Sequence, residues 1–302
     1  MSRRIAIFTD DPGWHGARLR EAFVAHGCES EFVSLQDCGF DIEGTGHGLV
    51  IPGFDELPDG VFVRGVPGGT LEQVVLYLDI LQALKHLGVC VYNDGSAIER
   101  SVDKGMTSFL LHSAGIPTPP TWVQGEGDRL SSTLKQEFEA GHEVVLKPLF
   151  GSQGEGLVRV SEFTQLPEQA LYNGVYYLQR FISTGADDAH DWRIFVINGQ
   201  AVAAMLRRGN GWISNVAQGA RCHAAVLDAE LKTLAEGAAD ALRMSYAGVD
   251  ILRDADGRSY VLEVNSIPAW KGLQQVCPVD VTRLLVEDFL SSCRSKPLTE
   301  VV

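Results

Sequence analysis

Short apolar runs alternate with helical patterns through the first third of the chain. Residues 4–8 are predicted to form a buried strand, and residues 13–26 carry apolar side chains at helical spacing before a glycine ends the pattern. The same reading predicts further strands at 31–33, 60–65 and 89–92, a helix at 70–87, and a glycine-rich loop with one or two short strands at 37–59. Strands that alternate with helices predict a small parallel α/β layer.

Hairpin patterns dominate the rest of the chain. Asn198-Gly199 and Asp256-Gly257 each lie between two apolar, alternating segments. Both dipeptides suit tight turns, because asparagine, aspartate and glycine tolerate positive φ. Helices are predicted at 228–244 and 279–292. The overall expectation is an α/β (α+β) fold with the parallel layer at its N-terminus.

Composition restricts the class of protein. The 302 residues, of which 45% are hydrophobic and 21% charged, are enough for two or three units with real cores. No apolar run approaches the roughly 18 residues of a membrane span, and the absence of an export signal predicts a cytoplasmic protein. Six cysteines without CxxC spacing are expected to be reduced thiols. The net charge of −14 argues against nucleic acid as a partner but not against anionic small molecules.

The hairpin around Asp256-Gly257 carries the first candidate chemistry. If these two residues form the loop, counting back along the ladder places Asp250 opposite Glu263, with Asn265 on the same face. Two facing carboxylates repel, and a hard cation relieves the conflict. Two carboxylates and an amide oxygen suit Mg²⁺. A solvated hairpin face is the alternative.

The hairpin around Asn198-Gly199 brings together acids and arginines. Asp191 and Arg193 share a face of its first strand. An ideal two-residue loop places Arg208 on that face and Arg207 on the opposite one. Such a group would suit a transferring phosphoryl group, and surface ion pairing is the alternative.

Three further features point to anions. Residues 151–156 place three glycines between two strands, so that backbone N–H groups can approach a phosphate beside Lys147. A helix is predicted to begin at Ser101 with Lys104 in its first turn, where the dipole disfavours a cation unless an anion is near. Arg64 ends a strand, a position where open α/β sheets bind ligands, and is a candidate for holding a substrate carboxylate. A flexible hairpin, a solvated lysine and a surface arginine are the respective alternatives.

Taken in order, seven motifs resemble the ATP-grasp superfamily, and specifically RimK-type α-L-glutamate ligases. They are Ile98-Glu-Arg-Ser-Val-Asp-Lys104, Gly115-Ile-Pro-Thr-Pro-Pro-Thr121, Lys147-Pro-Leu-Phe-Gly-Ser-Gln-Gly-Glu-Gly156, Gln179-Arg-Phe-Ile182, Asp191-Trp-Arg193, Ser214-Asn215 and Glu263-Val-Asn265. Within the group, Arg64-Gly-Val-Pro-Gly-Gly69, Ile98-Glu-Arg100 and Asn265-Ser-Ile-Pro-Ala-Trp-Lys-Gly272 look most like ligases that glutamylate tetrahydromethanopterin-type C1 carriers.

The resemblance implies an ATP-grasp fold behind an N-terminal pre-ATP-grasp domain. The domains would be 1–95 and 96–302, the second divided into 96–182 with the glycine loop and 183–302 with the magnesium site. The implied cofactors are ATP and Mg²⁺, with Mn²⁺ as a substitute. The implied nucleotide-binding residues are Lys104, Lys147, Ser152, Gln153, Gly154, Gly156, Gln179, Arg180, Phe181, Ile182, Asp191, Ser214 and Asn215.

The resemblance also assigns roles at the reacting centre. Metal ligands would be Asp250, Glu263 and Asn265, and catalytic groups Arg207, Arg193 and Lys147. Apart from these roles, Arg64 and Arg100 are candidate substrate contacts. The family favours Arg207 where the ladder favours Arg208, so a bulge or a miscount separates the two. The family usually has glutamate at the position of Arg180.

The implied activity is ATP-dependent amide formation between an acceptor carboxylate and L-glutamate, through an acyl phosphate. The implied partners are these two small molecules, without nucleic acid or membrane, and a homo-oligomer stays open. Related ligases modify a ribosomal protein tail, a deazaflavin cofactor or an amino-group carrier protein. The alternative from another class is a non-catalytic, regulatory ATP-binding module.

Overall fold

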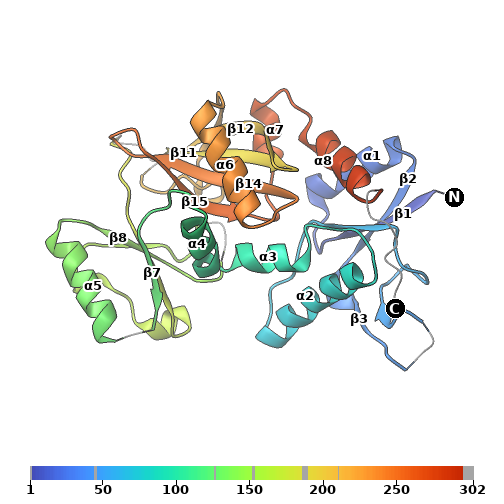
Figure 1. Ribbon diagram of the computed structural model, residues 1–302, viewed down its shortest axis with the longest axis horizontal. Helices are drawn as coiled ribbons and strands as arrows, with labels where there is room; N and C mark the ends of the chain where they lie inside the picture. Colours follow the sequence, from blue (N-terminus) through green and yellow to red (C-terminus); the bar gives the residue numbers. More distant parts are fainter. Residues whose placement is uncertain are drawn as a thin grey trace.

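The protein is described here from a computed structural model. It covers residues 2–43, 46–125, 127–151, 154–185, 190–209 and 211–294. Within these ranges the strands form a four-stranded parallel sheet, two antiparallel sheets of four and five strands, and one short two-stranded sheet (Figure 1). No helix in the described ranges is both long and apolar enough to cross a bilayer. None of the six cysteines forms a disulfide.

The N-terminal sheet is parallel and has the strand order β2-β1-β5-β6. Its strands are β1 (Arg3–Phe8), β2 (Cys28–Val33), β5 (Gly60–Val63) and β6 (Val91–Tyr92), and its helices are α1 (Gly13–Ala25) and α2 (Leu71–His86). Helix α2 begins at a capping box, in which Thr70 and Gln73 each bond the backbone of the other. The predicted parallel α/β layer is confirmed.

Short elements follow β2. They are a single-turn helix, η1 (Leu35–Asp37), and two strands that pair antiparallel, β3 (Gly39–Phe40) and β4 (Leu49–Val50). They lie within or beside the segment 37–59, for which the sequence predicts loop with one or two short strands.

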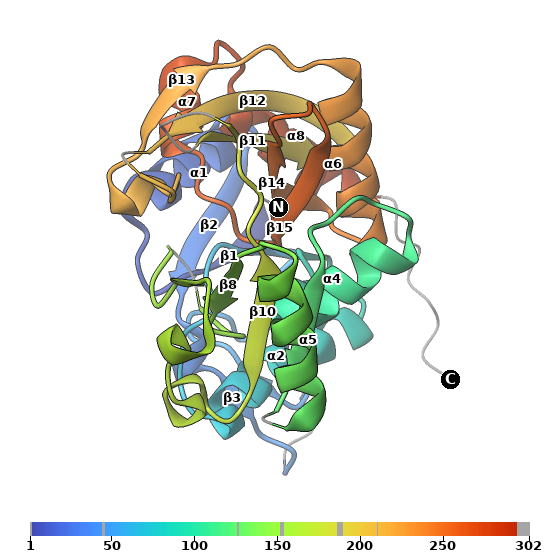
Figure 2. The same cartoon turned by 90° about the vertical axis from the view of Figure 1, so that its left-hand side faces the viewer.

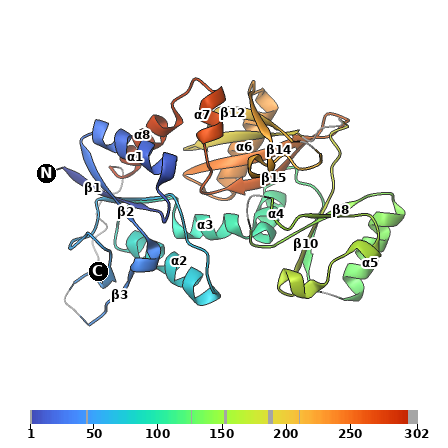
Figure 3. The same cartoon turned by 180° about the vertical axis from the view of Figure 1, so that it is seen from behind.

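Two helices connect the parallel sheet to the rest of the molecule. Helix α3 (Gly95–Val102) is capped by the side chain of Asp94, and α4 (Lys104–Ser113) by the side chain of Asp103. Seen from behind, they run between the N-terminal sheet and the two antiparallel sheets (Figure 3). Lys104 is the first residue of α4. The sequence predicts a helix that begins at Ser101 with Lys104 in its first turn, and this start is wrong, because Ser101 lies near the end of α3 and Asp103 caps α4.

The second sheet is antiparallel, with the strand order β7-β10-β8-β9. Its strands are β7 (Thr121–Gln124), β8 (Val144–Lys147), β9 (Val158–Val160) and β10 (Tyr176–Arg180), accompanied by α5 (Asp128–Glu139), η2 (Phe163–Gln165) and η3 (Gln169–Tyr172). Helix α5 packs Leu130 and Leu134 against this sheet. The sequence reading did not identify this helix.

The third sheet is antiparallel, with the order β13-β12-β11-β14-β15. Its strands are β11 (His190–Ile197), β12 (Gln200–Arg208), β13 (Arg221–Ala224), β14 (Tyr246–Arg253) and β15 (Ser259–Asn265). The accompanying helices are η4 (Val216–Gln218), α6 (Ala229–Ala241), α7 (Lys271–Val276) and α8 (Val281–Ser292). Figure 2 shows this sheet above β8 and β10 of the second sheet.

The β11–β12 hairpin turns at Asn198 and Gly199, whose φ angles of 48° and 69° fit the predicted two-residue loop. The register then shifts, because Val202 is an extra residue on β12. Beyond this bulge Asp191 pairs with Arg207. The ladder count that placed Arg208 on the face of Asp191 is wrong, since it assumed a hairpin without a bulge.

The β14–β15 hairpin has a different loop from the predicted one. Asp254 N–H donates to the carbonyl of Arg258, so three residues rather than two form the loop, and Gly257 takes a φ of 83°. An extra residue on β15, Leu262, shifts the register back. The predicted pairing of Asp250 with Glu263 is confirmed, although the predicted two-residue loop is wrong.

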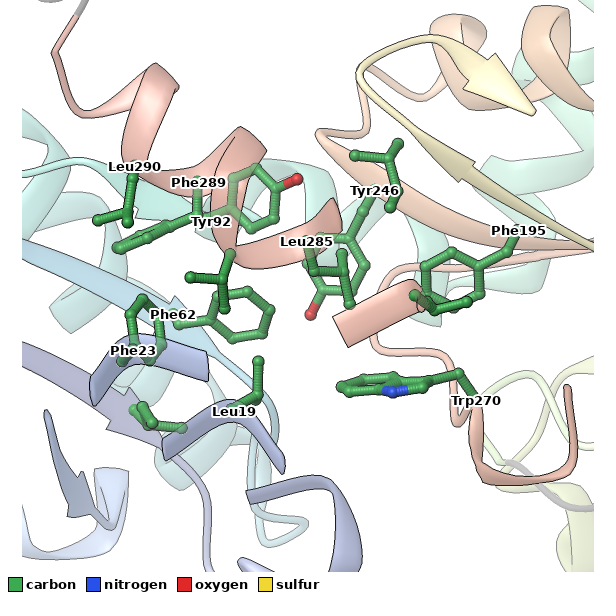
Figure 4. Close-up of a cluster of buried hydrophobic side chains, with 14 of the residues drawn as sticks. Leu19, Phe23, Phe62, Tyr92, Phe195, Tyr246, Trp270, Leu285, Phe289 and Leu290 are labelled. Atoms are coloured by element: carbon green, nitrogen blue, oxygen red, sulfur yellow. The ribbon is translucent and has the colours of Figure 1, made fainter. Parts of the chain in front are cut away.

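An aromatic core joins the parallel sheet to the third sheet (Figure 4). Tyr92 at the end of β6 stacks on Tyr246 at the start of β14, with ring centroids 5.0 Å apart. Buried Asn93 donates to the carbonyls of Tyr246 and Ser266 and accepts from the N–H of Ser245, each at 2.7 Å. These contacts fix the start of β14, which carries Asp250, against the parallel sheet. The domain boundaries at 95/96 and 182/183 stay predictions.

Candidate active site

A cavity of about 510 Å³ lies between the second and third sheets. Both sheets contribute polar side chains to its wall, and β8 and β11 lie on opposite sides of it. The predicted site residues that line it are Lys104, Lys147, Gly154, Gln179, Arg180, Phe181, Ile182, Asp191, Arg207, Ser214, Asn215, Asp250 and Glu263. Segments far apart in the sequence therefore converge on one cavity.

The remaining predicted site residues lie elsewhere. Arg193 and Asn265 are on strands of the third sheet beside the cavity. Arg100 lies against α6, where its Nε donates to the carbonyl of Leu242 at 3.0 Å. The carbonyl of Gly156 accepts from the Tyr172 hydroxyl at 3.0 Å. Ser152 and Gln153 fall outside the described residues, and Arg64 directly follows β5 of the parallel sheet.

Two lysines approach the cavity from the side of the second sheet. Lys147 ends β8, and its Nζ donates to Gln179 Oε1 at 2.7 Å. Burial is the main cause that lowers the pKa of Lys147 to about 8; nearby Glu263 opposes this shift and Lys104 adds to it. Lys104 Nζ donates to the carbonyl of Gly151 at 2.7 Å and so holds the start of the glycine loop.

Two acids and two arginines form a buried network on the third sheet. The Arg207 guanidinium donates from Nε to Asp191 Oδ1 at 2.7 Å, and from Nη2 to Asp250 Oδ2 at 2.9 Å. Arg193 donates from Nε and Nη2 to the two oxygens of Asp250, and Ser214 Oγ donates to Asp191 at 2.7 Å. Two positive and two negative charges thus balance in an environment that would penalise any one of them alone.

The electrostatics of this network follow from the ion pairs. Burial alone would raise the pKa of Asp250, but the adjacent guanidinium groups of Arg193 and Arg207 outweigh it and hold that pKa below its ordinary value. Likewise, burial would lower the pKa of Arg207, and the two carboxylates raise it instead. Asp250 is therefore an anion and Arg207 a cation at physiological pH.

Glu263 differs from Asp250 in having no such partner. Its carboxylate is half-buried and forms no hydrogen bond or ion pair with a described residue. Burial lowers the pKa of both Lys104 and Lys147, and the charge of Glu263 opposes this shift from across the cavity. Asn265 donates from Nδ2 to the carbonyl of Gly248 at 3.3 Å, which leaves its Oδ1 as an acceptor.

This donor set fits a hard divalent cation. It offers two carboxylates, those of Asp250 and Glu263, and the amide oxygen of Asn265. The described residues contain no group of three or more His, Cys, Asp or Glu side chains that could hold a metal. A cation here would therefore need other oxygen ligands, such as water or phosphate, which is the usual arrangement for Mg²⁺.

The far end of the cavity is flat and partly aromatic. The Arg159 guanidinium lies 3.7 Å from the centroid of the Phe181 ring, and Trp212 meets the same ring edge-on at 6.2 Å. Arg159 Nε is buried without a hydrogen-bond partner among the described residues. The sequence reading missed Arg159 and Trp212, although the alternation around Arg159 on β9 places it on the face of Val145 and Lys147.

Arg180, where the family usually has glutamate, directs its guanidinium to α5. Its Nε and Nη2 donate to the two oxygens of Glu137 at 2.7 and 2.8 Å. This ion pair lowers the pKa of Glu137. The charge at this position is thus satisfied by α5. Phe181 and Ile182 lie beyond the end of β10 and line the cavity.

The fold and the cavity define a class of protein that comparison with known families identifies. Residues 101–289 match the family described as the RimK-like ATP-grasp domain, and the chain belongs to this family. It is an ATP-dependent ligase of the ATP-grasp α-L-glutamate ligase group.

Relatives within this group carry names with different acceptors. A tetrahydromethanopterin:α-L-glutamate ligase of Methanocaldococcus jannaschii is 36% identical over 250 residues, which cover 80% of this chain and 82% of the relative. An α-aminoadipate–LysW ligase, LysX, of Saccharolobus solfataricus is 29% identical and covers 68% of this chain and 75% of its own. Among solved structures, the ATP-grasp ligase PsnB complexed with its minimal precursor, Mg and ADP has a TM-score of 0.72 at 21% identity, over 96% of this chain and 98% of PsnB.

Proposed function

We propose that the protein joins L-glutamate to the carboxylate of a tetrahydromethanopterin-type C1 carrier, with ATP as the energy source. The observation that carries this proposal is the meeting of opposite charges across one cavity. Lys104 and Lys147 approach from the second sheet, and Asp250 and Glu263 from the third. Cations suit the phosphates of ATP, and the acids suit a divalent cation bound to those phosphates.

The base of ATP would occupy the far end of the cavity. The ring of Phe181 and the guanidinium of Arg159 offer flat surfaces there, and Val145 and Ile182 add apolar ones. The backbone at the end of β10, just before Phe181, is held in place, because the N–H of Arg180 donates to the carbonyl of Pro120 at 2.8 Å. The triphosphate would then extend toward Lys147 and the acids.

The first chemical step would be phosphorylation of the acceptor. An acceptor carboxylate oxygen attacks the γ-phosphorus, the bond to the β,γ-bridging oxygen breaks, and an acyl phosphate and ADP form. Lys147, Lys104 and Arg207 would offset the negative charge that shifts during this step. Asp250, Glu263 and Asn265 would hold Mg²⁺, which when bound neutralises phosphate oxygens as a Lewis acid.

The second step would form the amide. The free α-amine of L-glutamate attacks the acyl carbon, the carbon–oxygen bond to phosphate breaks, and the nitrogen loses a proton as phosphate leaves. The glycine loop, whose start is held by Lys104, would exclude water that could hydrolyse the acyl phosphate.

The acceptor is the finer part of this proposal. Relatives named tetrahydromethanopterin:α-L-glutamate ligase are 34% and 36% identical over most of the chain. A ribosomal protein tail or a carrier protein is the second candidate, since LysX is also a relative. A non-catalytic regulatory module is the third. Retention of Lys147, Arg207 and Glu263 in one cavity speaks against it.

The test is ADP release by the purified protein with ATP and Mg²⁺. The acceptors would be tetrahydromethanopterin and a ribosomal tail peptide, each with and without L-glutamate, and mass spectrometry would identify the product. We expect glutamate-dependent ADP release and a glutamylated product with tetrahydromethanopterin. ADP release that does not depend on L-glutamate with any acceptor would contradict the proposal.

A further inference from the structure

Arg64 occupies a position in the parallel sheet that favours ligands. In the order β2-β1-β5-β6 the chain leaves β1 for β2 on one side and later forms β5 on the other. The carboxyl ends of β1 and β5 therefore border a crevice at a topological switch point. Arg64 directly follows β5, and its N–H donates to the carbonyl of Phe8, the last residue of β1, at 2.8 Å.

The Arg64 guanidinium lacks the partner that a buried cation normally has. It forms no ion pair with any described residue, and its Nε is buried without a hydrogen bond. Its Nη1 makes one long contact, 3.4 Å, to the carbonyl of Ile267, and its Cζ lies 5.4 Å from the centroid of the Trp270 ring. Since a buried charge without a counter-charge is costly, the site is incomplete without an anion.

The groups around Arg64 leave its charge unbalanced. His15 accepts at Nε2 from the N–H groups of Trp270 and Lys271, at 3.1 and 3.3 Å. Burial, together with the charges of Arg64 and Lys271, lowers the pKa of His15 to about 4, so the imidazole is neutral. Lys271 adds a second cation, which pairs with no described acid. Asp11 is near enough to raise the pKa of Arg64 but forms no ion pair with it.

The crevice connects to the proposed reacting centre through one loop. Arg64 contacts Ile267, and the next residue, Pro268, packs over Gly248 on β14. A Cβ at Gly248 would lie 2.7 Å from Pro268 Cβ and 3.1 Å from Arg193 Cδ, so only glycine allows this approach. Arg193 in turn holds Asp250. Pro268 and Arg193 thus both pack at Gly248, so the loop that Arg64 contacts lies beside the strand that carries Asp250.

We infer that Arg64, with Lys271 beside it, binds a carboxylate of one of the two substrates of ligation. This inference rests on the proposed function for the identity of the substrates. L-Glutamate has two carboxylates that do not react, and a glutamylated acceptor ends in carboxylates as well, so either can supply the anion. A planar guanidinium with free donors suits a carboxylate, and the position keeps it apart from the γ-phosphate.

The experiment compares Arg64→Met and Arg64→Lys with Arg20→Met in the full-length chain. Arg20 is a matched control, since its guanidinium also stacks on an aromatic ring, 4.0 Å from the centroid of Phe32, but lies on the outer side of α1. Lys271→Met serves as a second variant, because this exposed side chain can be removed without a core defect. Isothermal titration would measure binding of ADP with Mg²⁺, L-glutamate, and glutarate, a dicarboxylate without an amine.

We expect Arg64→Met to weaken dicarboxylate binding by about 10- to 100-fold, the range for a lost charged hydrogen bond. Arg64→Lys should lose less, Lys271→Met about 10-fold at most, and Arg20→Met nothing. Binding of ADP with Mg²⁺ should be unchanged in all four. Unchanged dicarboxylate binding in Arg64→Met and Lys271→Met, or no dicarboxylate binding by the parent chain, would overturn the inference.

Turnover then distinguishes the source of the carboxylate. A rise in KM for L-glutamate alone assigns the site to glutamate, and a rise in KM for tetrahydromethanopterin alone assigns it to the acceptor. A lower melting temperature with neither KM changed would show that Arg64 is only structural, which also overturns the inference. Failure of the proposed function is a separate result, since it appears as glutamate-independent ADP release by the parent chain.

Discussion

The two hairpins of the third sheet reach the same cavity by opposite departures from ideal geometry. The β11–β12 hairpin has the ideal loop, Asn198-Gly199, and one bulge at Val202. The β14–β15 hairpin has a longer loop and one bulge at Leu262. One departure reverses which side chains face the cavity, whereas two restore them, because side chains alternate with a period of two.

This difference decides which charges meet. In the first hairpin the bulge turns Arg207 inward, to Asp191 and Asp250, and leaves Arg208 exposed. In the second, the longer loop and the bulge cancel, so Asp250 and Glu263 remain opposite each other. Counting from a turn is thus reliable only where the number of irregularities is known.

The largest expected effect belongs to the second hairpin. Glu263→Ala should reduce magnesium-dependent turnover by about 1,000-fold or more, because it removes a carboxylate from the proposed metal site. Stability should change by no more than about 1 kcal/mol, since Glu263 bonds no described residue. Steady-state kinetics and urea unfolding measure the two effects.

The control for this change is Asp256→Ala at the tip of the same hairpin, which should behave like the parent. Unchanged magnesium-dependent turnover in Glu263→Ala would refute the metal assignment.

The first hairpin offers a matched pair of neighbours. Arg207→Met should lower kcat by about 100- to 1,000-fold. It should also cost about 3–5 kcal/mol of stability, because Asp191 and Asp250 lose a buried counter-charge. Arg208→Met should change stability by about 0.5 kcal/mol or less. Chemical denaturation and kcat measurements would show the contrast.

Arg207→Lys covers the case in which the Met variant does not fold, since lysine keeps the charge but not the two-pronged geometry. Equal losses of kcat at 207 and 208 would mean that the bulge at Val202 is misplaced.

The ionisation of Lys147, which faces both hairpins across the cavity, predicts how activity depends on pH. With a pKa of about 8 in the free protein, Lys147 is protonated below pH 8 and neutral above it. Because kcat/KM reports the free enzyme, kcat/KM for ATP should fall about tenfold per pH unit above that pKa. Lys147→Arg keeps its charge over this range and should lack the decline. A flat profile to pH 10 in the parent would contradict the burial of this amine.

The smallest expected effect is on stability, from glycine substitutions in the loops of the two hairpins. Gly199 and Gly257 have φ angles of 69° and 83°, and no atom lies within 4 Å of a Cβ added to either. Gly199→Ala and Gly257→Ala should therefore each cost about 1 kcal/mol from backbone strain alone. Urea midpoints would measure this, with kcat unchanged. A large kcat effect in only one variant would show that its loop controls the register.

Much of the fold follows from local patterns in the sequence. Apolar patterns located β1, α1, α2 and α6, and the side chains of Thr70 and Asp94 cap α2 and α3 locally. Helix α5 was missed, although Leu130 and Leu134 are buried at helical spacing. Local signals suffice where a residue's role depends on its neighbours in the chain.

Local sequence patterns predicted some residues of the candidate site but not others. Lys147, the glycine loop and Asp250 opposite Glu263 came from patterns of a few residues. Arg159 and Trp212 did not, because both contact Phe181, which follows β10 in another part of the chain. The ion pair of Arg180 with Glu137 joins residues 43 positions apart, which no short-range pattern predicts.

The sequence by itself determined the family, the order of the elements and the types of charged group available for chemistry. The tertiary structure decided which of these groups meet: Arg207 rather than Arg208 at Asp191, the three-residue loop at Gly257, and Arg64 at the switch point with no ion-pair partner among the described residues. The physical reason is that bulges and burial are set by packing between distant segments, so a shift of one residue reverses a side chain without changing any local pattern.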